Sequence, residues 1–385
     1  MNKKVKGSSA IGKYGLLIAL VAIVIFFQII TKGTLLTPLN ITNILMQNSY
    51  LIILGIGMLF VIIAGDFDMS VGYGAGFVGA VIGVLCVQVG LPVIPVILIA
   101  LAIGIGMGCY QGVLVAYFKV PAFVVTLGNM MVFRGLMLIT LKSQTIGPTP
   151  DFLNAVSINY LPDIKVGTVN IVTIIVGAIA SIIYVIASAR GRVKAKEYGV
   201  ETSAKGFALK SIIVVVVIML LAFAFSRHNG IPYILILLAI IIGVYSFIGN
   251  KTTLGRRVYA LGGNEKATRL SGINTKKTKF IVFVNMGLLT AVAGIVYTAR
   301  LNYATPSAGS DFAMDAIAAC FIGGASSKGG SGTIFGTIVG ALVMGVLNNG
   351  MQLLGLGTEV QQLVKGLVLI FAVLLDVTTK SASRD

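Results

Sequence analysis

The chain has 385 residues and a formal net charge of +17; 57% of the residues are hydrophobic, only 11% are charged, and the mean hydropathy is +1.00. A soluble domain carries roughly 25% charged residues, so a set of soluble domains is excluded. The apolar residues form runs that approach the roughly 20 residues a helix needs to cross a bilayer. They lack the short alternating pattern of a β-barrel. The sequence therefore predicts an all-α polytopic membrane protein.

The predicted membrane crossings are helices separated by short polar loops. About twelve crossings are expected on the length criterion, at 14–30, 44–64, 71–89, 92–118, 121–141, 168–189, 208–226, 231–249, 279–299, 312–326, 333–353 and 357–376. The segment 312–326 is the weakest of these, because it is short and ends in glycines. The first helix is predicted to be an uncleaved membrane segment, because no small-residue cleavage site follows it.

The basic residues indicate how the chain is oriented. With the N-terminus inside, most of the 29 Lys and Arg residues fall in loops on the cytoplasmic side, including 190–207 and 250–278. This is the asymmetry of the positive-inside rule, and it makes a nucleic-acid partner unnecessary as an explanation for the charge. Both termini are predicted to be cytoplasmic. The three cysteines all lie in apolar segments and are expected to be packing residues.

Two carboxylates, Asp66 and Asp68, stand between two strongly apolar stretches in "AGDFDMSVGYG". Gly65 is expected to end one crossing and Ser70 to cap the next, so the acids lie just before a helix N-terminus, where the helix dipole favours negative charge. They form either a simple turn and cap, or contacts to a solute in a hydrated cavity. On the second alternative, Asp68 is expected to tolerate Asn poorly and Asp66 to tolerate it better.

Two cations and a glycine-rich stretch also lie in or beside the apolar segments. Arg134 and Lys365 lie within apolar segments, so each is either functional or paired with an outer acid such as Asp311, Asp315 or Glu359. The stretch "FIGGASSKGGSGTIFG" lacks the Lys directly after glycine that a Walker A phosphate loop requires. It is expected to be a non-helical passage between helices.

The loop 253–279 is too polar for the membrane and too short to form a domain. Within it, "NEKATRLSGI" predicts a short helix with Asn264 as N-cap and Gly272 after its last turn. This helix is either a solvated loop or a docking surface for a cytoplasmic partner.

Motifs along most of the chain resemble those of the monosaccharide branch of ABC-importer permeases, which transport ribose, xylose, galactose and multiple sugars. The segment 253–279 resembles the "EAA…G" coupling region that docks on the ATP-hydrolysing subunit. Three other stretches are similar to that family: "VIIAGDFDMSVG", "PAFVVTLGNMMVFRGL" and "AIAACFIGGASSKGGSGTIFGTIVGALVMGVLNNGMQLLG". The hairpin 208–249 is similar to the longer xylose and multiple-sugar type, whereas Ala325 and Lys328 depart from the common pattern.

The resemblance implies a single permease domain over 1–385, of the ribose-type, vitamin-B12-permease-like class, in the cytoplasmic membrane of a prokaryote. It implies no catalytic residues and no metal or cofactor in this chain, with ATP and Mg held by a partner ATPase. A second permease copy, the ATPase, an extracytoplasmic sugar-binding protein and membrane lipid are the implied partners. The pathway or gate is expected to include Asp66, Asp68, Ser70, Phe123, Thr126, Asn129, Arg134, Asn348 and Asn349. Coupling to the ATPase is expected to involve Asn264, Glu265, Lys266, Ala267, Arg269, Gly272 and Ile273.

Two other transport functions remain open on the sequence. An ion-driven secondary transporter would be expected to carry intramembrane acids or His as an ion relay, and few are available here. A branched-chain amino-acid ABC permease shares the architecture but matches the motifs less well. A membrane enzyme is disfavoured, because no triad, metal cluster or acid–base pair is visible in the sequence.

Overall fold

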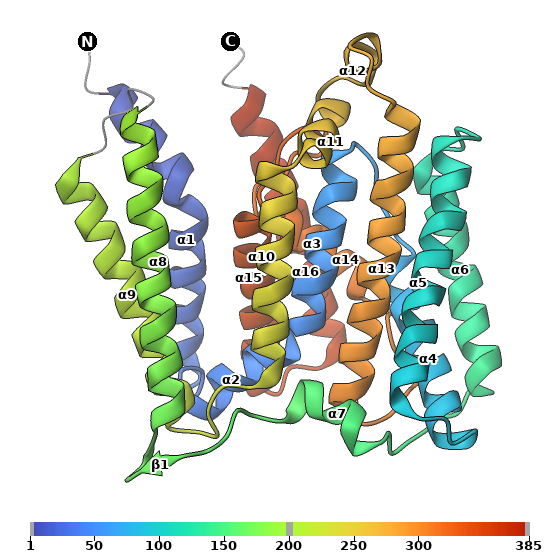
Figure 1. The fold of residues 1–385 in the computed structure, drawn as a ribbon, viewed down its shortest axis with the longest axis horizontal. Helices are drawn as coiled ribbons and strands as arrows, with labels where there is room; N and C mark the ends of the chain where they lie inside the picture. Colours follow the sequence, from blue (N-terminus) through green and yellow to red (C-terminus); the bar gives the residue numbers. More distant parts are fainter. Residues whose placement is uncertain (1–3, 198–202, 382–385) are drawn as a thin grey trace. The chain divides into compact units, whose positions relative to one another are not determined.

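The computed structural model describes residues 4–197 and 203–381, and these residues are mostly helical (Figure 1). Among the described residues, eight helices are long and apolar enough to cross a membrane, or up to nine if a bent pair is counted as one span. The prediction of a polytopic helical membrane protein is confirmed. The count of about twelve crossings stays a prediction.

The helix boundaries lie close to the predicted crossings. In chain order the elements are α1 (Lys4–Ile30), α2 (Pro38–Gln47), α3 (Ser49–Ile63), α4 (Val71–Gly83), the π-helical turn η1 (Val84–Gln88), α5 (Val93–Ala116), α6 (Ala122–Leu141), α7 (Asp151–Ile158), β1 (Lys165–Val166), β2 (Val169–Asn170), α8 (Ile171–Glu197), α9 (Ala204–Ser226), α10 (Tyr233–Lys251), α11 (Thr253–Gly263), α12 (Glu265–Leu270), α13 (Thr275–Leu301), α14 (Phe312–Ile322), α15 (Ile334–Leu353) and α16 (Thr358–Ser381).

The chain forms two compact units rather than one continuous cluster. The first unit comprises Met1–Leu35, Ile44–Ile158 and Ile234–Asp385, and the second comprises Leu36–Asn43 and Asn159–Tyr233. In the second unit, α8 packs against α9, and β1 pairs antiparallel with β2. The two helices of the predicted hairpin 208–249 fall in different units, so the hairpin stays a prediction.

The long helix α13 is the centre of the first unit. It packs against α3, α4 and α5. A Cβ added at Gly104 of α5 would collide with the backbone of Gly287 of α13, and one at Gly108 would collide with the backbone around Phe283. Small residues let helix backbones approach closely in membranes. These glycines of α5 therefore serve helix packing.

The segment 312–326 is not a full crossing, which corrects the sequence-based prediction. Its helix α14 has 11 residues, which corresponds to roughly 16 Å of helix, whereas a bilayer core is about 30 Å thick. The chain then continues without helix until Ile334, as expected for the glycine-rich stretch. Within a membrane, irregular backbone has to be buried in protein or line a water-filled cavity. It is tied in place where Gly330 N donates to the carbonyl of Ile63, 2.8 Å away.

The break between α3 and α4 is also non-helical. α3 ends at Ile63, and the chain passes through 64–70 before α4 begins. A Cβ at Gly74, in the first turn of α4, would touch Thr290 near the middle of α13. α4 therefore begins well inside the helical bundle of this unit.

Candidate functional site

Asp68 holds the start of α4. Its Oδ1 accepts from the backbone N of Ser70 at 2.9 Å and from the Ser70 hydroxyl at 2.6 Å. Ser70 occupies the N-cap position of α4 as predicted, but its side chain makes no capping bond; its backbone N–H and its hydroxyl are both held by Asp68. Gln111 of α5 donates its amide to the Ser70 hydroxyl, which extends the network to a second helix.

Asp66 has a different partner. Its Oδ2 lies 2.9 Å from the Lys279 ammonium, and the same ammonium lies 4.0 Å from the Glu265 carboxylate. Burial raises the pKa of the Asp66 carboxyl, and the positive charge of Lys279 opposes that rise. The ion pair is partly shielded from water, because the side chains of Lys279 and Asp66 are only 17% and 13% exposed. Lys279 thus connects the helix break with the coupling segment.

Among the described residues, only one of the predicted pathway residues on α6 forms a hydrogen bond to the break between α3 and α4. The Thr126 hydroxyl donates to the backbone carbonyl of Phe67 at 3.3 Å, which ties α6 to the break. Asn129, one helical turn further on, is buried, and its Nδ2 has no partner among the described residues. Phe123 is half exposed on the same helix.

The remaining predicted pathway residues lie elsewhere in the first unit. Arg134 forms none of the ion pairs found among the described residues and instead lies over the ring of Tyr73, 5.5 Å from its centroid. Lys365 does pair with Asp315, at 3.1 Å, and approaches Asp311 to 3.9 Å. Asn348 hydrogen-bonds to the same Asp315 carboxyl. The ion pair expected as one alternative is therefore confirmed for Lys365 and wrong for Arg134. Asn349 is buried on α15.

The predicted coupling helix is formed as expected. The Asn264 side chain caps α12 by accepting from Ala267 N at 2.9 Å, and Gly272 follows the helix with a φ of +81°. That backbone conformation favours glycine, since it carries no Cβ. Leu270 at the end of α12 is 86% exposed, an unusual position for a large apolar side chain.

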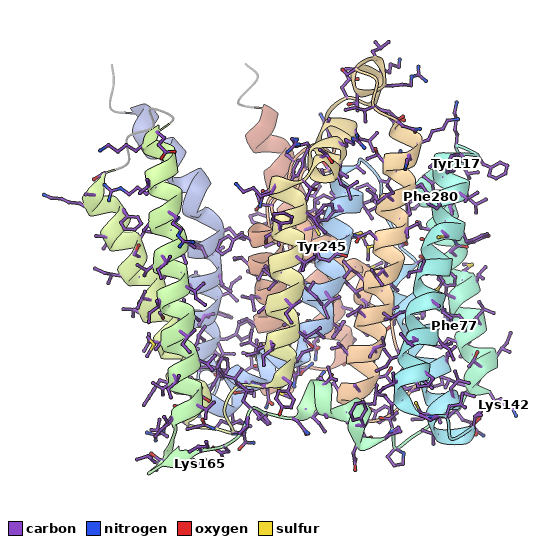
Figure 2. The ribbon with its side chains drawn as sticks, viewed as in Figure 1. Phe77, Tyr117, Lys142, Lys165, Tyr245 and Phe280 are labelled. Atoms are coloured by element: carbon purple, nitrogen blue, oxygen red, sulfur yellow. The ribbon has the colours of Figure 1, made fainter. Side chains whose placement is uncertain are left out.

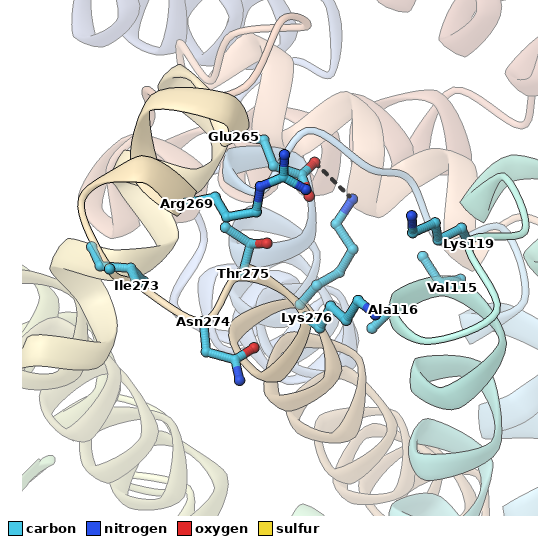
Figure 3. A pocket seen from close by; sticks show the side chains of 11 residues that line it. Val115, Ala116, Lys119, Glu265, Arg269, Ile273, Asn274, Thr275 and Lys276 are labelled. Carbon is cyan, nitrogen blue, oxygen red and sulfur yellow. Dashed lines mark ion pairs between the residues drawn. The ribbon is translucent and has the colours of Figure 1, made fainter.

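A basic cavity of about 590 Å³ lies between α12, the start of α13 and the end of α5 (Figure 3). Four of the predicted coupling residues line it: Glu265, Arg269, Gly272 and Ile273. The cations around it are Lys119, Arg269, Lys276 and Lys279. Beside it, Tyr117 packs edge to face on Phe280, with ring centroids 5.9 Å apart (Figure 2). The surface is therefore suited to an acidic or polar partner.

The coupling segment is in direct contact with both non-helical segments. A Cβ at Gly262 of α11 would collide with the carbonyl of Ile63 and crowd Gly330 N. The Tyr259 hydroxyl donates to the carbonyl of Gly332 at 2.7 Å. A displacement of α11 and α12 therefore acts directly on the end of α3 and on the glycine-rich segment.

Lys279 and Gln111 were missed by the sequence interpretation. Lys279 was assigned to the start of a crossing as one of several basic loop residues, and nothing local identifies its partner. Gln111 could have been identified from the sequence, because it is an isolated amide side chain inside the apolar run "GMGCYQGVLVA". Polar residues within membrane segments usually have a specific partner.

Comparison with known proteins identifies the family of this chain. Residues 40–373 match the sequence profile of the family described as "Branched-chain amino acid transport system / permease component". The chain belongs to this family of permease components.

Its curated relatives include several sugar permeases. The chain is 40% identical over 372 residues to the xylose transport system permease protein of Haemophilus influenzae, a match that covers 95% of this chain and 96% of the relative. It is 38% identical over 370 residues to the corresponding protein of Escherichia coli K12, covering 95% and 91%. The ribose import permease protein of Haemophilus influenzae is 35% identical over 337 residues, covering 88% and 84%. No solved structure matches the chain.

Proposed function

We propose that this chain is the membrane-spanning permease subunit of an ATP-binding-cassette importer for a monosaccharide, with xylose as the first candidate. The observation that carries the proposal is the 40% identity to a xylose permease across 95% of the chain. The exposed, capped helix α12 in the loop expected to couple to an ATPase supports it independently. In this function the permease makes and breaks no covalent bonds.

The energy for transport comes from a partner subunit that hydrolyses ATP. A separate ATPase, which holds ATP and Mg, docks on α12 and the basic cavity, where Leu270 offers an apolar contact and the lysines and Arg269 offer charge. A second permease copy completes the translocation pathway, and an extracytoplasmic sugar-binding protein delivers the solute. A weak site in the pathway suits this role, because a passage must release what it binds.

The proposed orientation places α12 and both termini on the cytoplasmic side of a prokaryotic inner or plasma membrane. The start of α1, the end of α16 and α12 lie at the same end of the first unit, which supports this proposal (Figure 1). A ribose-type, vitamin-B12-permease-like fold completes it, in which the short helix α14 is not a full crossing.

The decisive experiment is reconstitution. The permease, its neighbouring ATPase and the binding protein are placed in liposomes, and ATP-driven uptake of labelled xylose is measured. Uptake is expected to require ATP and the binding protein. Glu265→Lys is expected to lower uptake and xylose-stimulated ATP hydrolysis at least tenfold while the permease still inserts. ATP-independent uptake driven by a sodium or proton gradient would contradict the proposal and favour a secondary transporter.

The family description favours one second candidate, a branched-chain amino-acid permease. Uptake of labelled leucine or valine in the same liposomes, with the binding protein from the same operon, separates the two candidates. Leucine-stimulated ATP hydrolysis without any response to xylose would assign the chain to amino-acid import.

A further inference from the structure

A second, smaller cavity lies between α14 and α16. Its volume is about 270 Å³, slightly below the roughly 300–1,000 Å³ typical of sites for drug-sized ligands. Four residues on each side lie at positions i, i+3, i+4 and i+7, which is the spacing of one helix face. The α14 side consists of Asp311 and the helix residues Met314, Asp315 and Ala318; the α16 side consists of Gln362, Lys365, Gly366 and Leu369.

The cavity combines hydrogen-bond donors, acceptors and an apolar wall. The Lys365 ammonium lies 3.1 Å from Asp315, whose side chain is only 3% exposed, and 3.9 Å from Asp311. Ser310 and Gln362 add a hydroxyl and an amide, while Met314, Met344 and Leu369 supply apolar surface. Asn348 bonds to Asp315 from α15, and its buried Oδ1 has no partner in the described part of the chain.

The charge balance argues against a cation as the ligand. Lys365 already occupies the space between the two carboxylates, so a metal ion or sodium would have to displace a fixed ammonium. A neutral polyhydroxyl solute meets no such barrier, because each hydroxyl both donates and accepts a hydrogen bond. Its carbon-bound hydrogens match the methionine and leucine wall. Charged partners shorten and strengthen hydrogen bonds to such hydroxyls.

We propose that this cavity is a transit subsite for a monosaccharide, in which the Asp315–Lys365 pair, Asp311 and Gln362 bind the sugar hydroxyls. The subsite rests on the proposed sugar-import function. It lies away from the coupling loop, since the aromatic side chain of Phe312 at the start of α14 packs on Tyr50 at the start of α3, whereas α11 meets the other end of α3.

The test uses cysteine protection in the assembled permease–ATPase complex with Cys86, Cys109 and Cys320 removed. Ser310→Cys places a nearly isosteric thiol at the cavity without touching the ion pair. Ser307→Cys, also exposed and in the same loop but outside the cavity, is the matched control. Xylose is expected to slow maleimide modification of the Ser310→Cys variant saturably, by at least threefold, and to leave the Ser307→Cys variant unchanged. Betaine at equal osmolarity controls for solvent effects.

A second pair of variants tests the recognition chemistry. Gln362→Leu removes a cavity amide, and is expected to raise the half-protecting xylose concentration about tenfold, the effect of losing one good hydrogen bond. Gln361→Leu makes the same change one position away, outside the cavity, and is expected to have no effect on protection. Lys365 and Asp315 are left intact, because removing one partner of a buried pair destabilises the fold.

The possible results distinguish a failure of the proposed subsite from a failure of the proposed function. Normal ATP-driven xylose uptake with no protection of the Ser310→Cys thiol would overturn the subsite and leave the proposed function standing. Protection by sodium chloride but not by xylose would overturn it in favour of a cation site. Protection by xylose that Gln362→Leu and Gln361→Leu weaken equally would overturn the assigned contacts. Saturable protection in a complex that imports no sugar would support sugar binding and refute the transport function.

Discussion

Asp66 and Asp68 are close neighbours in sequence, but they contact different parts of the chain. Asp68 is almost completely buried and accepts two hydrogen bonds from Ser70, which an Asn oxygen can also accept. Asp66 pairs with a cation, Lys279, which an Asn cannot neutralise. The geometry therefore reverses the ranking that the sequence alone suggested for the two Asn substitutions.

Asp66→Asn is expected to reduce ATP-driven sugar uptake about tenfold or more, whereas Asp68→Asn is expected to retain most of it. Asn keeps an oxygen acceptor at both positions, but Asp66→Asn removes the charge that neutralises Lys279 in a partly buried ion pair, and leaving such a cation uncompensated costs about 3–5 kcal/mol when the pair is fully buried. Uptake is measured at matched membrane expression. The exchange variant Asp66→Lys with Lys279→Asp serves as a control and should recover part of the activity. A greater loss in Asp68→Asn than in Asp66→Asn would contradict this assignment.

At the scale of elements, α11 joins the coupling helix to the non-helical segments. Gly262 sits against the carbonyl of Ile63 and beside Gly330, so it has no room for a side chain. Gly263 follows it, and a Cβ there would meet nothing within 4 Å. Two adjacent glycines thus differ completely in what surrounds them.

Gly262→Ala is expected to lose most sugar-stimulated ATP hydrolysis, and Gly263→Ala is expected to keep it. Overpacking of this kind typically costs about 1–3 kcal/mol, which here falls on the contact between α11, α3 and the segment before α15. ATP hydrolysis in the reconstituted complex is the measurement, and the amount of assembled complex is the control. Equal activity of the two variants would show that this contact does not transmit coupling.

Much of the element structure follows from local sequence. Long apolar runs, the Asn264 cap and the glycine after α12 are encoded within a few residues, and the structure has them where they were expected. The Asp66–Lys279 pair joins residues far apart in the chain, and no local pattern reveals it. A cation in an apolar run did indicate an acidic partner for Lys365, but the sequence did not single out Asp315 or predict the cavity beside the pair. The sequence predicted a crossing at the short α14 because its residues are apolar. Apolar residues indicate that a helix is buried, but a helix buried by protein is as apolar as one facing lipid.

At the scale of the whole molecule, orientation is the property to test. The exposed side chains of Lys276 and Lys142 lie at opposite ends of the first unit. In a background without native cysteines, Lys276→Cys is expected to react with an impermeant maleimide only from the cytoplasmic side, and Lys142→Cys only from outside. Lys142 is preferred to Thr149 as the labelling site at its end of the unit, because Thr149 is buried and bonded to Asn154. Labelling of the Lys276→Cys variant from outside would overturn both the orientation and the coupling assignment.

The helix α13 connects these two ends. Near its start, Lys279 holds Asp66, and just after its end Asn302 accepts hydrogen bonds from Thr149 and Asn154. These contacts are roughly 35 Å apart along a continuous helix, at 1.5 Å per residue. Because α13 is a continuous helix packed against α3, α4 and α5, a rigid-body shift of α13 would move both ends together. If the proposed ATPase acts at the Lys279 end, a rigid movement of α13 is therefore the direct route by which it would strain the Asn302 contacts with Thr149 and Asn154 at the far end.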